Sequence, residues 1–474
     1  MATYFKNTVE VQVFTEGAPT ETQSFSYPLC MIPHNITANT IDSFSDVAAI
    51  TSAGFAVNSP AYMMAQGSLS GIAPPDLVKI GRMDVDTISI TVDTLVATGG
   101  TLSVNTNVNG VDSIVSITVA AEASVEDLAD SLYAALLLAY PASADNPVFT
   151  DPAGASDTII ITPQTYTCSF GWRSLDGTVP HTTITTQTSD SYSTSIGSAL
   201  QEDDDVSFIM IESKDETDIL EVAAYTKTLE LQQFLTSTDI AAVKDSGSTD
   251  NLALDLQGFA YDKTYMQFHP QAANYWPEAA WMSNFAKLDP WTLYNPGGLV
   301  AMVGVPSITI TDQEAITLTA RNVSWNKLER NQQYLKGGWA SSGMFLDYQR
   351  FALWLKYATE TALFNLKRKQ NNLGRAIPYS DEGSAMMENA VQKDVINVGI
   401  RGGRIATGTT RSEFGVINLN PIVDFGARAD QTDTNIANRI WDEGFVEVVM
   451  LSGIDQIKVK AYALTNRQFE LNNA

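Results

Sequence analysis

Residues 343–370 read GMFLDYQRFALWLKYATETALFNLKRKQ, and this stretch decides how the second half of the chain is interpreted. Its apolar side chains recur every three or four residues, which is the spacing of one face of a helix. They are Phe345, Tyr348, Phe351, Leu353, Trp354, Leu355, Ala362, Leu363, Phe364 and Leu366. The stripe is so wide that we expect one long helix that is mostly buried.

Three consecutive cations, Lys367, Arg368 and Lys369, close this helix, where the negative end of the helix dipole favours positive charge. Residues 372–406 follow with NLGRAIPYSDEGSAMMENAVQKDVINVGIRGGRIA, which contains a Gly/Pro break and a capping signal at 380–383. The pattern predicts a second amphipathic helix and a glycine-rich exit.

The glycine-rich exit at 399–408 carries Arg401 and Arg404 and has two interpretations. Its backbone N–H groups could cradle an anion, or its glycines could form a hinge. The spacing does not separate the two.

The formal net charge of −26 is unevenly distributed. Residues 1–320 hold 9 basic and 38 acidic side chains, residues 321–411 hold 14 and 7, and residues 412–474 hold 5 and 9. An acidic chain argues against nucleic acid as a direct partner, because phosphates need a basic surface. The positive segment is either a solvated helix face or a surface that docks on an acidic neighbour.

Cysteine content and apolar runs point to synthesis in a reducing cytoplasm. Cys30 and Cys168 are too few for a disulfide framework and are not spaced as metal ligands. No apolar run is long enough to span a membrane, so we expect no membrane insertion. The first residues, MATYFKNTVEVQV, lack the basic and apolar regions of a secretory signal.

Both ends of the chain alternate between apolar and polar residues with the period of a β-strand, at 8–13 and at 457–463. A lone strand has unpaired backbone groups and must join a sheet edge. Either the two ends of one chain pair with each other, or each end pairs with a neighbouring copy.

A polar, strand-rich segment separates two parts of the chain. Between Met83 and Ser213 the only basic residue is Arg173, and Ser, Thr and Val dominate. Strand patterns recur at 87–95, 102–104, 114–119, 158–162, 166–170 and 181–188. Asn109-Gly110 is typical of a hairpin turn, and Ser124–Asp127 is a capping box that opens a helix to about residue 140. We expect a β-rich, solvent-facing domain inserted at 85–199.

Strand and helix patterns alternate on either side of this insertion, which favours an α/β arrangement. They include strands at 206–211 and 264–269 and helices at 219–231 and 277–287. The predicted fold class is therefore α/β (α+β). Its predicted parts are an N-terminal arm at 1–24, a discontinuous core at 25–84 and 200–453, the β-rich insertion at 85–199 and a C-terminal arm at 454–474.

No motif predicts catalysis. His34, His181 and His269 lie far apart and have no metal-ligand spacing. Asp424-Phe425-Gly426 spells a kinase triplet without the other kinase motifs, and Asp203–Asp205 lacks the alternating ligands of a calcium loop. We therefore expect a protein that is not an enzyme, with no catalytic residue, no metal site and no cofactor.

Three segments resemble contractile tail sheath proteins of bacterial viruses. Residues 43–82, with AYMMAQG and PPDLVKIGR, are similar to the opening of such proteins. Residues 344–406, with IPYSDEG, resemble their most characteristic region, and residues 445–464, FVEVVMLSGIDQIKVKAYAL, resemble their closing strands. The β-rich segment sits where sheath proteins often carry a surface insertion, and residues 245–340 are placed only by position.

The resemblance implies a structural role. In that family six copies form each ring, rings stack around an inner tube, and contraction drives the tube through a bacterial envelope. Terminal strands join the sheets of adjacent copies, which favours pairing between copies here. The strand residues implied are Val9, Val11, Val13, Ile457, Val459 and Ala461. The cations that would contact a neighbour or the tube are Lys367, Arg368, Lys369, Arg401 and Arg404.

The partners implied are other copies of the chain, the tail tube protein, and baseplate and tail terminator proteins, in a virion made in the bacterial cytoplasm. One alternative is a baseplate component or another virion structural protein. Another is an acidic α/β hydrolase with an appended β module, which predicts a monomer with perturbed carboxylates in a pocket. A secreted surface-layer protein would need the signal peptide that the sequence lacks.

Overall fold

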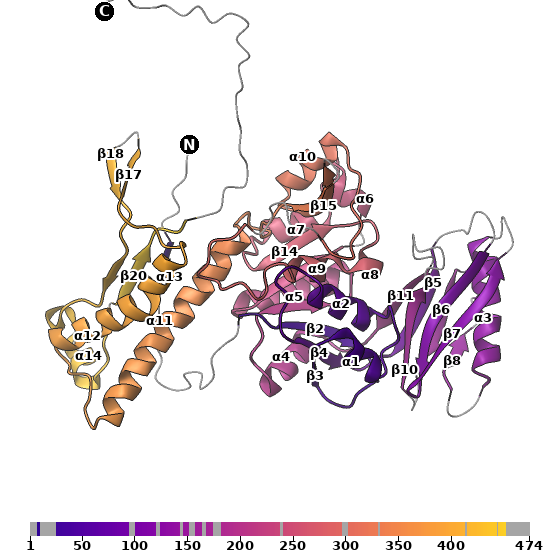
Figure 1. Ribbon diagram of the computed structural model, residues 1–474, viewed down its shortest axis with the longest axis horizontal. Coiled ribbons are helices and arrows are strands. Elements are labelled where there is room, and N and C mark those ends of the chain that lie inside the picture. Colours follow the sequence, from indigo (N-terminus) through magenta and orange to yellow (C-terminus); the bar gives the residue numbers. More distant parts are fainter. Residues whose placement is uncertain are drawn as a thin grey trace, which may run out of the picture.

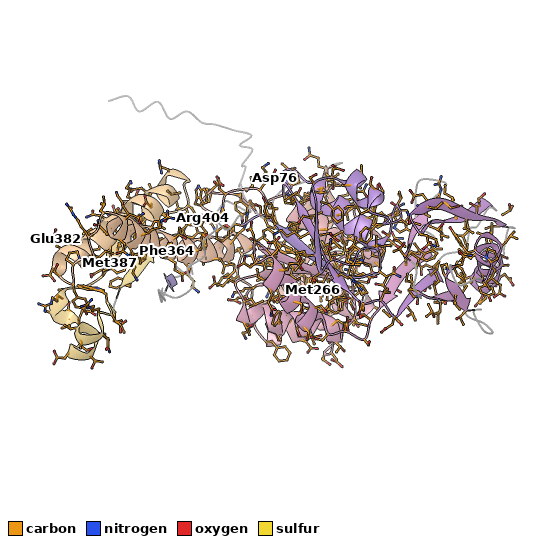
Figure 2. All side chains as sticks on the ribbon, turned by 90° about the horizontal axis from the view of Figure 1, so that it is seen from below. Asp76, Met266, Phe364, Glu382, Met387 and Arg404 are labelled. Carbon is orange, nitrogen blue, oxygen red and sulfur yellow. The ribbon has the colours of Figure 1, made fainter. Side chains whose placement is uncertain are left out.

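An eight-stranded sheet lies at the centre of the molecule, between a C-terminal lobe and a β-rich module (Figure 1). The computed structural model describes residues 7–9, 25–93, 100–119, 124–142, 146–150, 157–163, 167–173, 182–237, 240–295, 302–329, 332–412, 415–442 and 444–451. Figure 2 shows the same elongated arrangement from below, with Met266 in the central part and Phe364, Glu382 and Met387 in the lobe. The predicted α/β fold class with additional β-rich content is confirmed.

The central sheet is parallel except at its two edges. Its order is β16 (Gln332–Lys336), β15 (Ser324–Glu329), β14 (Thr264–Phe268), β13 (Gln232–Thr236), β12 (Phe208–Ile211), β2 (Pro28–Pro33), β4 (Val78–Met83) and β3 (Ile41–Phe44). The edge strands β16 and β3 run antiparallel to their neighbours. Such a sheet needs apolar cover on both faces.

Helices provide that cover. One face packs against α1 (Val47–Ser52), α2 (Pro60–Leu69), α8 (Ala272–Tyr275) and α9 (Pro277–Met282). The other packs against α4 (Tyr192–Glu202), α5 (Glu216–Thr228), α6 (Ile240–Lys244), α7 (Leu252–Gly258) and α10 (Asp312–Ala320). Along β12 the side chains alternate between the two cores: Phe208 and Met210 enter the first, Ile209 and Ile211 the second.

The β-rich module consists of two antiparallel sheets and one helix around a separate core. One sheet has the order β10 (Cys168–Arg173), β6 (Gly100–Val108), β7 (Val111–Val119). The other has the order β11 (Thr182–Gln187), β5 (Thr87–Val92), β9 (Thr158–Thr162), β8 (Val148–Thr150). Helix α3 (Val125–Ala139) begins with the predicted capping box at Ser124, and the predicted hairpin turn at Asn109-Gly110 is a two-residue loop. Both residues of that loop have positive φ, 54° and 77°, as a type I′ turn requires.

The module docks on the central part through hydrogen bonds to one loop. Asn105 Nδ2 donates to Val57 O over 3.0 Å, and Asn58 Nδ2 donates to Trp172 O over 2.9 Å. Gly171 permits the close approach, since a Cβ there would lie 2.0 Å from Val57 O. Hydrogen bonds from both sides of this contact therefore hold the module against the loop at residues 57–58.

The position of helix α4 differs from the predicted domain division, which assigned residues 85–199 to the insertion outside the core. Tyr192, Ile196 and Ala199 lie in the core beneath the central sheet. The chain leaves the module after Gln187, where Asp86 N donates to Gln187 O over 2.8 Å. The β-rich module is therefore defined by residues 87–187.

The C-terminal lobe is built around α11 (Leu346–Asn372), which confirms the predicted long helix. The other lobe elements are α12 (Asp381–Val391), a π-helical turn (Gln392–Ile396), α13 (Asn397–Arg401), β17 (Thr409–Ser412), β18 (Gly415–Asn418), β19 (Ile422–Asp424), a 3₁₀ turn (Arg428–Asp430), α14 (Asp433–Asn438) and β20 (Phe445–Val448). The lobe also includes β1 (Asn7–Val9), which joins β20. Figure 1 shows the lobe in orange and yellow at one end of the molecule, opposite the β-rich module.

The burial of α11 differs along its length, although the sequence predicts a helix that is mostly buried. Its first part is buried in the lobe core with Phe351, Trp354 and Leu355. After Ala362 no side chain of the helix is buried, and Phe364 and Leu366 are half-exposed. The expectation of general burial was wrong for this end, because the lobe core covers the apolar stripe only as far as Ala362.

Candidate functional site

The N-terminal strand completes a small sheet in the C-terminal lobe. Asn7, Thr8 and Val9 lie opposite Val448, Glu447 and Val446 in an antiparallel pair. On its other side β20 pairs with β19, so the order is β1-β20-β19. We call these three strands the arm sheet.

The middle strand of the arm sheet is part of the lobe core. Val446 and Val448 are buried, with Phe425 and the helices of the lobe packed against them. A two-stranded ribbon is only marginally stable in water, whereas a third strand and a packed face stabilise it. The strand β1 therefore fills an edge that β20 would otherwise leave unpaired.

Of the strand residues predicted to pair between copies, the structure places Val9, opposite Val446 of the same chain. The others lie outside the described residues: Val11, Val13, Ile457, Val459 and Ala461. His181, one of the three histidines, also lies outside them.

The predicted contact cations fall into two groups. Lys367, Arg368 and Lys369 are exposed near the end of α11, and within the described part of the chain none of them pairs with a carboxylate. Arg401 is also exposed, and its Nε donates to Asn397 O one turn earlier, over 3.2 Å. Lys367, Arg368 and Lys369, together with the half-exposed apolar side chains at the same end of α11, form a surface that is suited to an acidic protein partner.

The structure does not support the prediction that Arg404 contacts a neighbouring chain. Its side chain is fully buried and its Nη1 lies 2.6 Å from Asp347 Oδ2 in the first turn of α11. The guanidinium also lies over the ring of Tyr348, 5.1 Å from the ring centroid. A buried, paired cation cannot reach another chain, so Arg404 stabilises the interior of the lobe.

Sequence reasoning missed Asp347 and Arg350, the charged residues within the apolar stripe of α11. Both are buried, and Arg350 Nη2 donates to Phe25 O over 2.9 Å. A charged side chain on an otherwise apolar helix face was the available signal, because such a residue needs a buried partner.

A buried polar cluster lies where the parallel strands of the central sheet end. Glu212 follows β12 and accepts hydrogen bonds from the N–H and the hydroxyl of Thr186 in the module. Lys214 pairs with the buried Glu278, and its ammonium lies over the ring of Trp276. Burial raises the pKa of Glu212 to about 8 and lowers the pKa of Lys214. These groups join the module and α9 to the sheet.

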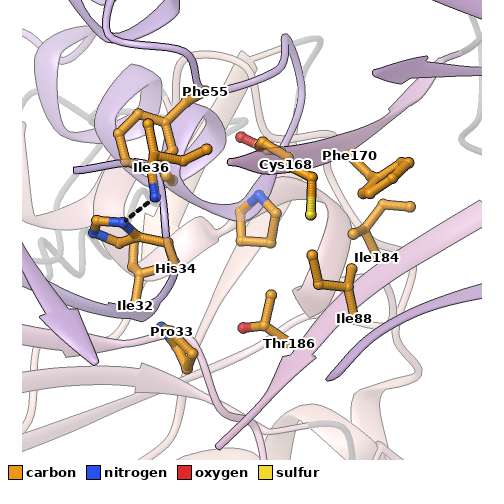
Figure 3. Close-up of a pocket in the computed structure, with 14 residues that line it drawn as sticks. Ile32, Pro33, His34, Ile36, Phe55, Ile88, Cys168, Phe170, Ile184 and Thr186 are labelled. Carbon is orange, nitrogen blue, oxygen red and sulfur yellow. Dashed lines mark hydrogen bonds between the residues drawn. The ribbon is translucent and has the colours of Figure 1, made fainter. Parts of the chain in front are cut away.

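A small apolar recess lies beside this cluster, between the module and the central part (Figure 3). Its walls include Phe55, Ile88, Cys168 and Ile184. Burial raises the pKa of the Cys168 thiol to about 12, so the thiol stays protonated and is a poor nucleophile at neutral pH. The perturbed carboxyl of Glu212 does not line this recess.

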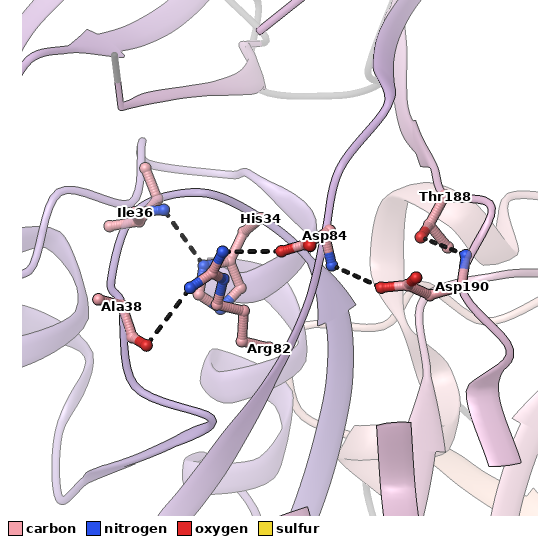
Figure 4. Close-up of polar contacts among 7 residues, drawn as sticks. All are labelled: His34, Ile36, Ala38, Arg82, Asp84, Thr188 and Asp190. Carbon is pink, nitrogen blue, oxygen red and sulfur yellow. Dashed lines mark hydrogen bonds and ion pairs between the residues drawn. The ribbon is translucent and has the colours of Figure 1, made fainter. Parts of the chain in front are cut away.

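His34 borders the recess as a neutral ring (Figures 3 and 4). Its Nδ1 accepts from Ile36 N over 3.3 Å, so the ring proton belongs on Nε2. Burial and the nearby Arg82 guanidinium lower the pKa of His34 to about 4. Figure 4 also shows the hydrogen bond from Asp84 N to Asp190 Oδ2, which is 3.1 Å long. This bond links the segment that enters the module to the segment that leaves it.

The described part of the chain contains no group of three or more His, Cys, Asp or Glu side chains that could hold a metal ion. Within the same residues, no helix has the length and apolar character needed to cross a membrane.

No protein-family model matches the sequence, and no curated protein sequence matches it either. Among solved structures, the chain is similar to the sheath tail protein from Desulfitobacterium hafniense. The two are 11% identical, the match covers 94% of this chain and 100% of the other, and the TM-score is 0.46.

Proposed function

We propose that this chain is the structural subunit of the contractile tail sheath of a bacterial virus. Copies would form hexameric rings that stack around an inner tail tube, and contraction would drive the tube through the bacterial envelope. The tube protein, the baseplate and the tail terminator are the further partners. The proposal includes no catalytic step and no cofactor.

One observation carries the proposal: the third strand of the arm sheet comes from the opposite end of the chain. Thr8 lies opposite Glu447, and residues 10–24 connect β1 to Phe25 along the chain. Fifteen extended residues span at most about 50 Å, roughly twice the ~23 Å radius of gyration expected for a chain of this length. The same strand can therefore fill the β20 edge of its own subunit or of an adjacent one.

Strand exchange suits a sheath. Backbone hydrogen bonds between an arm and a neighbour's sheet can persist while whole subunits rotate past each other. A head-to-tail contact that does not close produces a helical filament. The resemblance of IPYSDEG and of the terminal strands to tail sheath proteins is the independent support for this type of assembly.

The exposed end of α11 provides a second contact. Lys367, Arg368 and Lys369 stand beside apolar side chains that the lobe leaves half-exposed, including Phe364. An acidic surface on an adjacent copy or on the tube fits both features. We place the β-rich module on the outside of the assembly, because it lies at the opposite end of the molecule (Figure 1).

Negative-stain electron microscopy of the concentrated protein tests the proposal. We expect hollow tubes with sixfold end views, because arm exchange needs only copies of this chain. A variant that lacks residues 1–16 should remain folded but form no tubes, since it lacks β1. Tubes formed by that truncation would refute the role of the arm, and a full-length protein that stays monomeric at high concentration would contradict self-assembly.

A further inference from the structure

The N-terminal arm enters the fold at Phe25, in a strained backbone conformation. Phe25 has φ of 55°, which is unfavourable for a residue with a bulky side chain. Its ring is buried in the lobe core and meets the ring of Tyr357 edge-on, with centroids 5.3 Å apart. Such a conformation persists only where surrounding contacts hold it.

Arg350 supplies those contacts from α11. Its Nη2 donates to Phe25 O over 2.9 Å and to Ala286 O over 2.7 Å, and its Nη1 donates to Phe285 O over 2.8 Å. The side chain is 2% exposed, and no ion pair within the described residues includes it. A planar guanidinium can hold several carbonyl groups at fixed angles, which an ammonium cannot do.

These bonds join three segments at one point. Arg350 belongs to the lobe helix, Phe285 and Ala286 follow α9 in the central part, and Phe25 is the root of the arm. We propose that Arg350 and Phe25 form an anchor that fixes where the N-terminal arm leaves the subunit, and so directs β1 to the β20 edge. Arg350 is a positioning residue in this assignment, since it does not touch β20 itself.

The anchor acts through the effective concentration of the strand. With Phe25 held in the lobe, the arm starts next to the sheet that β1 joins. Without the anchor, the first fixed residue is Tyr27, whose carbonyl accepts from Ser207 N over 2.9 Å in the central sheet. The tether to β1 then starts away from the arm sheet and covers residues 10–26 instead of 10–24, so the strand must search a larger volume. The anchor serves pairing within one subunit and pairing between subunits alike. Only its value for assembly rests on the proposed function.

Arg321 offers a matched control. It is also buried and donates to four backbone carbonyls, those of Ala242, Val243, Asp245 and Ser248. Its bonds lie within the central part and involve no residue of the arm. Replacing either arginine removes hydrogen bonds from a buried guanidinium to backbone carbonyls. Only the loss of Arg350 should also free the root of the N-terminal arm.

The test uses a disulfide between paired strands. Thr8→Cys and Glu447→Cys place two thiols at directly opposite positions of β1 and β20, within the range that a disulfide spans. The native Cys30 and Cys168 are buried, and burial raises the pKa of each to about 12, so they compete little. The readout is the initial rate of oxidation summed over bonds within a chain and between chains.

In this background, Arg350→Met should lower the summed rate by at least about 1.2-fold, the loss that the longer tether alone causes when effective concentration falls as roughly the −3/2 power of tether length. Arg321→Met should leave the rate unchanged. Equal rates in the two variants would overturn the anchor. If Arg350→Met does not fold, Phe25→Ala takes its place and should lower the oxidation rate by the same factor. An unchanged oxidation rate in Phe25→Ala would contradict the anchor. Bonds found only within chains, at a rate that still depends on Arg350, would contradict strand exchange and leave the anchor intact.

Discussion

Asp347 and Arg404 form a fully buried ion pair, with 2.6 Å between Oδ2 and Nη1, that joins the start of α11 to the glycine-rich exit of the lobe. Burial raises the pKa of Asp347, although the Arg404 guanidinium opposes the shift. The pair holds together two segments that lie 57 residues apart in the sequence. The stability of the lobe should therefore depend on both partners together.

Removing one partner should destabilise the protein strongly. Arg404→Met leaves the Asp347 carboxylate buried and unpaired, which typically costs about 3–5 kcal/mol. Lys287→Met, which breaks an exposed pair with Asp76, should change stability by about 1 kcal/mol or less. Urea unfolding of the two variants checks the contrast. A double variant, Asp347→Leu with Arg404→Met, should regain most of the loss, and an equally large loss in the double variant would contradict the pairing argument.

Stability should fall as pH rises through the range set by Glu212. Its pKa is about 8 in the fold because of burial and 4.5 in the unfolded reference. The unfolded chain therefore releases this proton first, and the contribution of Glu212 to stability declines from about pH 5 to about pH 8. The buried His34, with a pKa lowered to about 4, has the opposite effect up to about pH 6.5, so the decline should be clearest between about pH 6.5 and pH 8. Glu212→Gln should flatten that decline in urea unfolding midpoints measured across the range.

Glu221→Gln is the control for this pH dependence. Burial is the largest single influence on the pKa of Glu221 and raises it, but the hydrogen bonds from Ser191 and Ser193 together outweigh burial and hold the pKa below its usual value. Glu221 is thus ionised in both states above about pH 5 and should not affect the slope. An unchanged decline in the Glu212→Gln variant would contradict the assignment.

The β-rich module should be removable at its paired ends. Thr87 and Gln187 lie opposite each other on β5 and β11, so an Asn-Gly turn can join them after residues 88–186 are excised. We expect this variant to fold and still form tubes, since α4 stays in place. Excision of 85–199 should instead unfold the protein, because Ile196 and its neighbours leave the central core.

Circular dichroism and electron microscopy distinguish the outcomes of the two excisions. A folded 88–186 excision that stays monomeric would show that the module takes part in assembly. A folded 85–199 excision would contradict the placement of α4 in the core.

Charge reversal at the end of α11 should weaken assembly without unfolding the subunit. Replacing Lys367, Arg368 and Lys369 with Glu should lower thermal stability only modestly, by about 0.3–1 kcal/mol per side chain at the negative end of the helix, because all three are exposed. The critical concentration for polymerisation should rise, and its dependence on salt should decrease. Light scattering at several salt concentrations measures both quantities.

The matched control reverses three cations of the central part. Lys227, Lys244 and Lys327 carry the same total charge and belong to α5, α6 and β15 of the central part. An equal rise in critical concentration in both variants would mean that net charge, rather than this surface, governs assembly.

Features fixed by neighbouring residues could be predicted from the sequence. The hairpin at Asn109-Gly110 and the capping box at Ser124 depend on residues within three positions of each other. The long helix α11 depends on its own periodicity. Each of these was found as expected.

Features that depend on distant partners could not be predicted. The burial of Arg404 follows from Asp347, and the place of Ile196 in the central core follows from β2 and α5. The half-exposure of Phe364 follows from where the lobe core ends. The pairing of β1 with β20 joins the two ends of the chain, and no local pattern specifies which sheet edge a strand joins.

The most direct test of strand exchange is where the disulfide forms between Thr8→Cys and Glu447→Cys in assembled protein. Oxidation of tubes, followed by non-reducing gel electrophoresis, should give a ladder of covalently linked chains. Oxidation of dilute monomer should give single chains with an internal bond. Tubes that contain only internally bonded chains would contradict the account, because assembly would then proceed without exchange of the N-terminal strand.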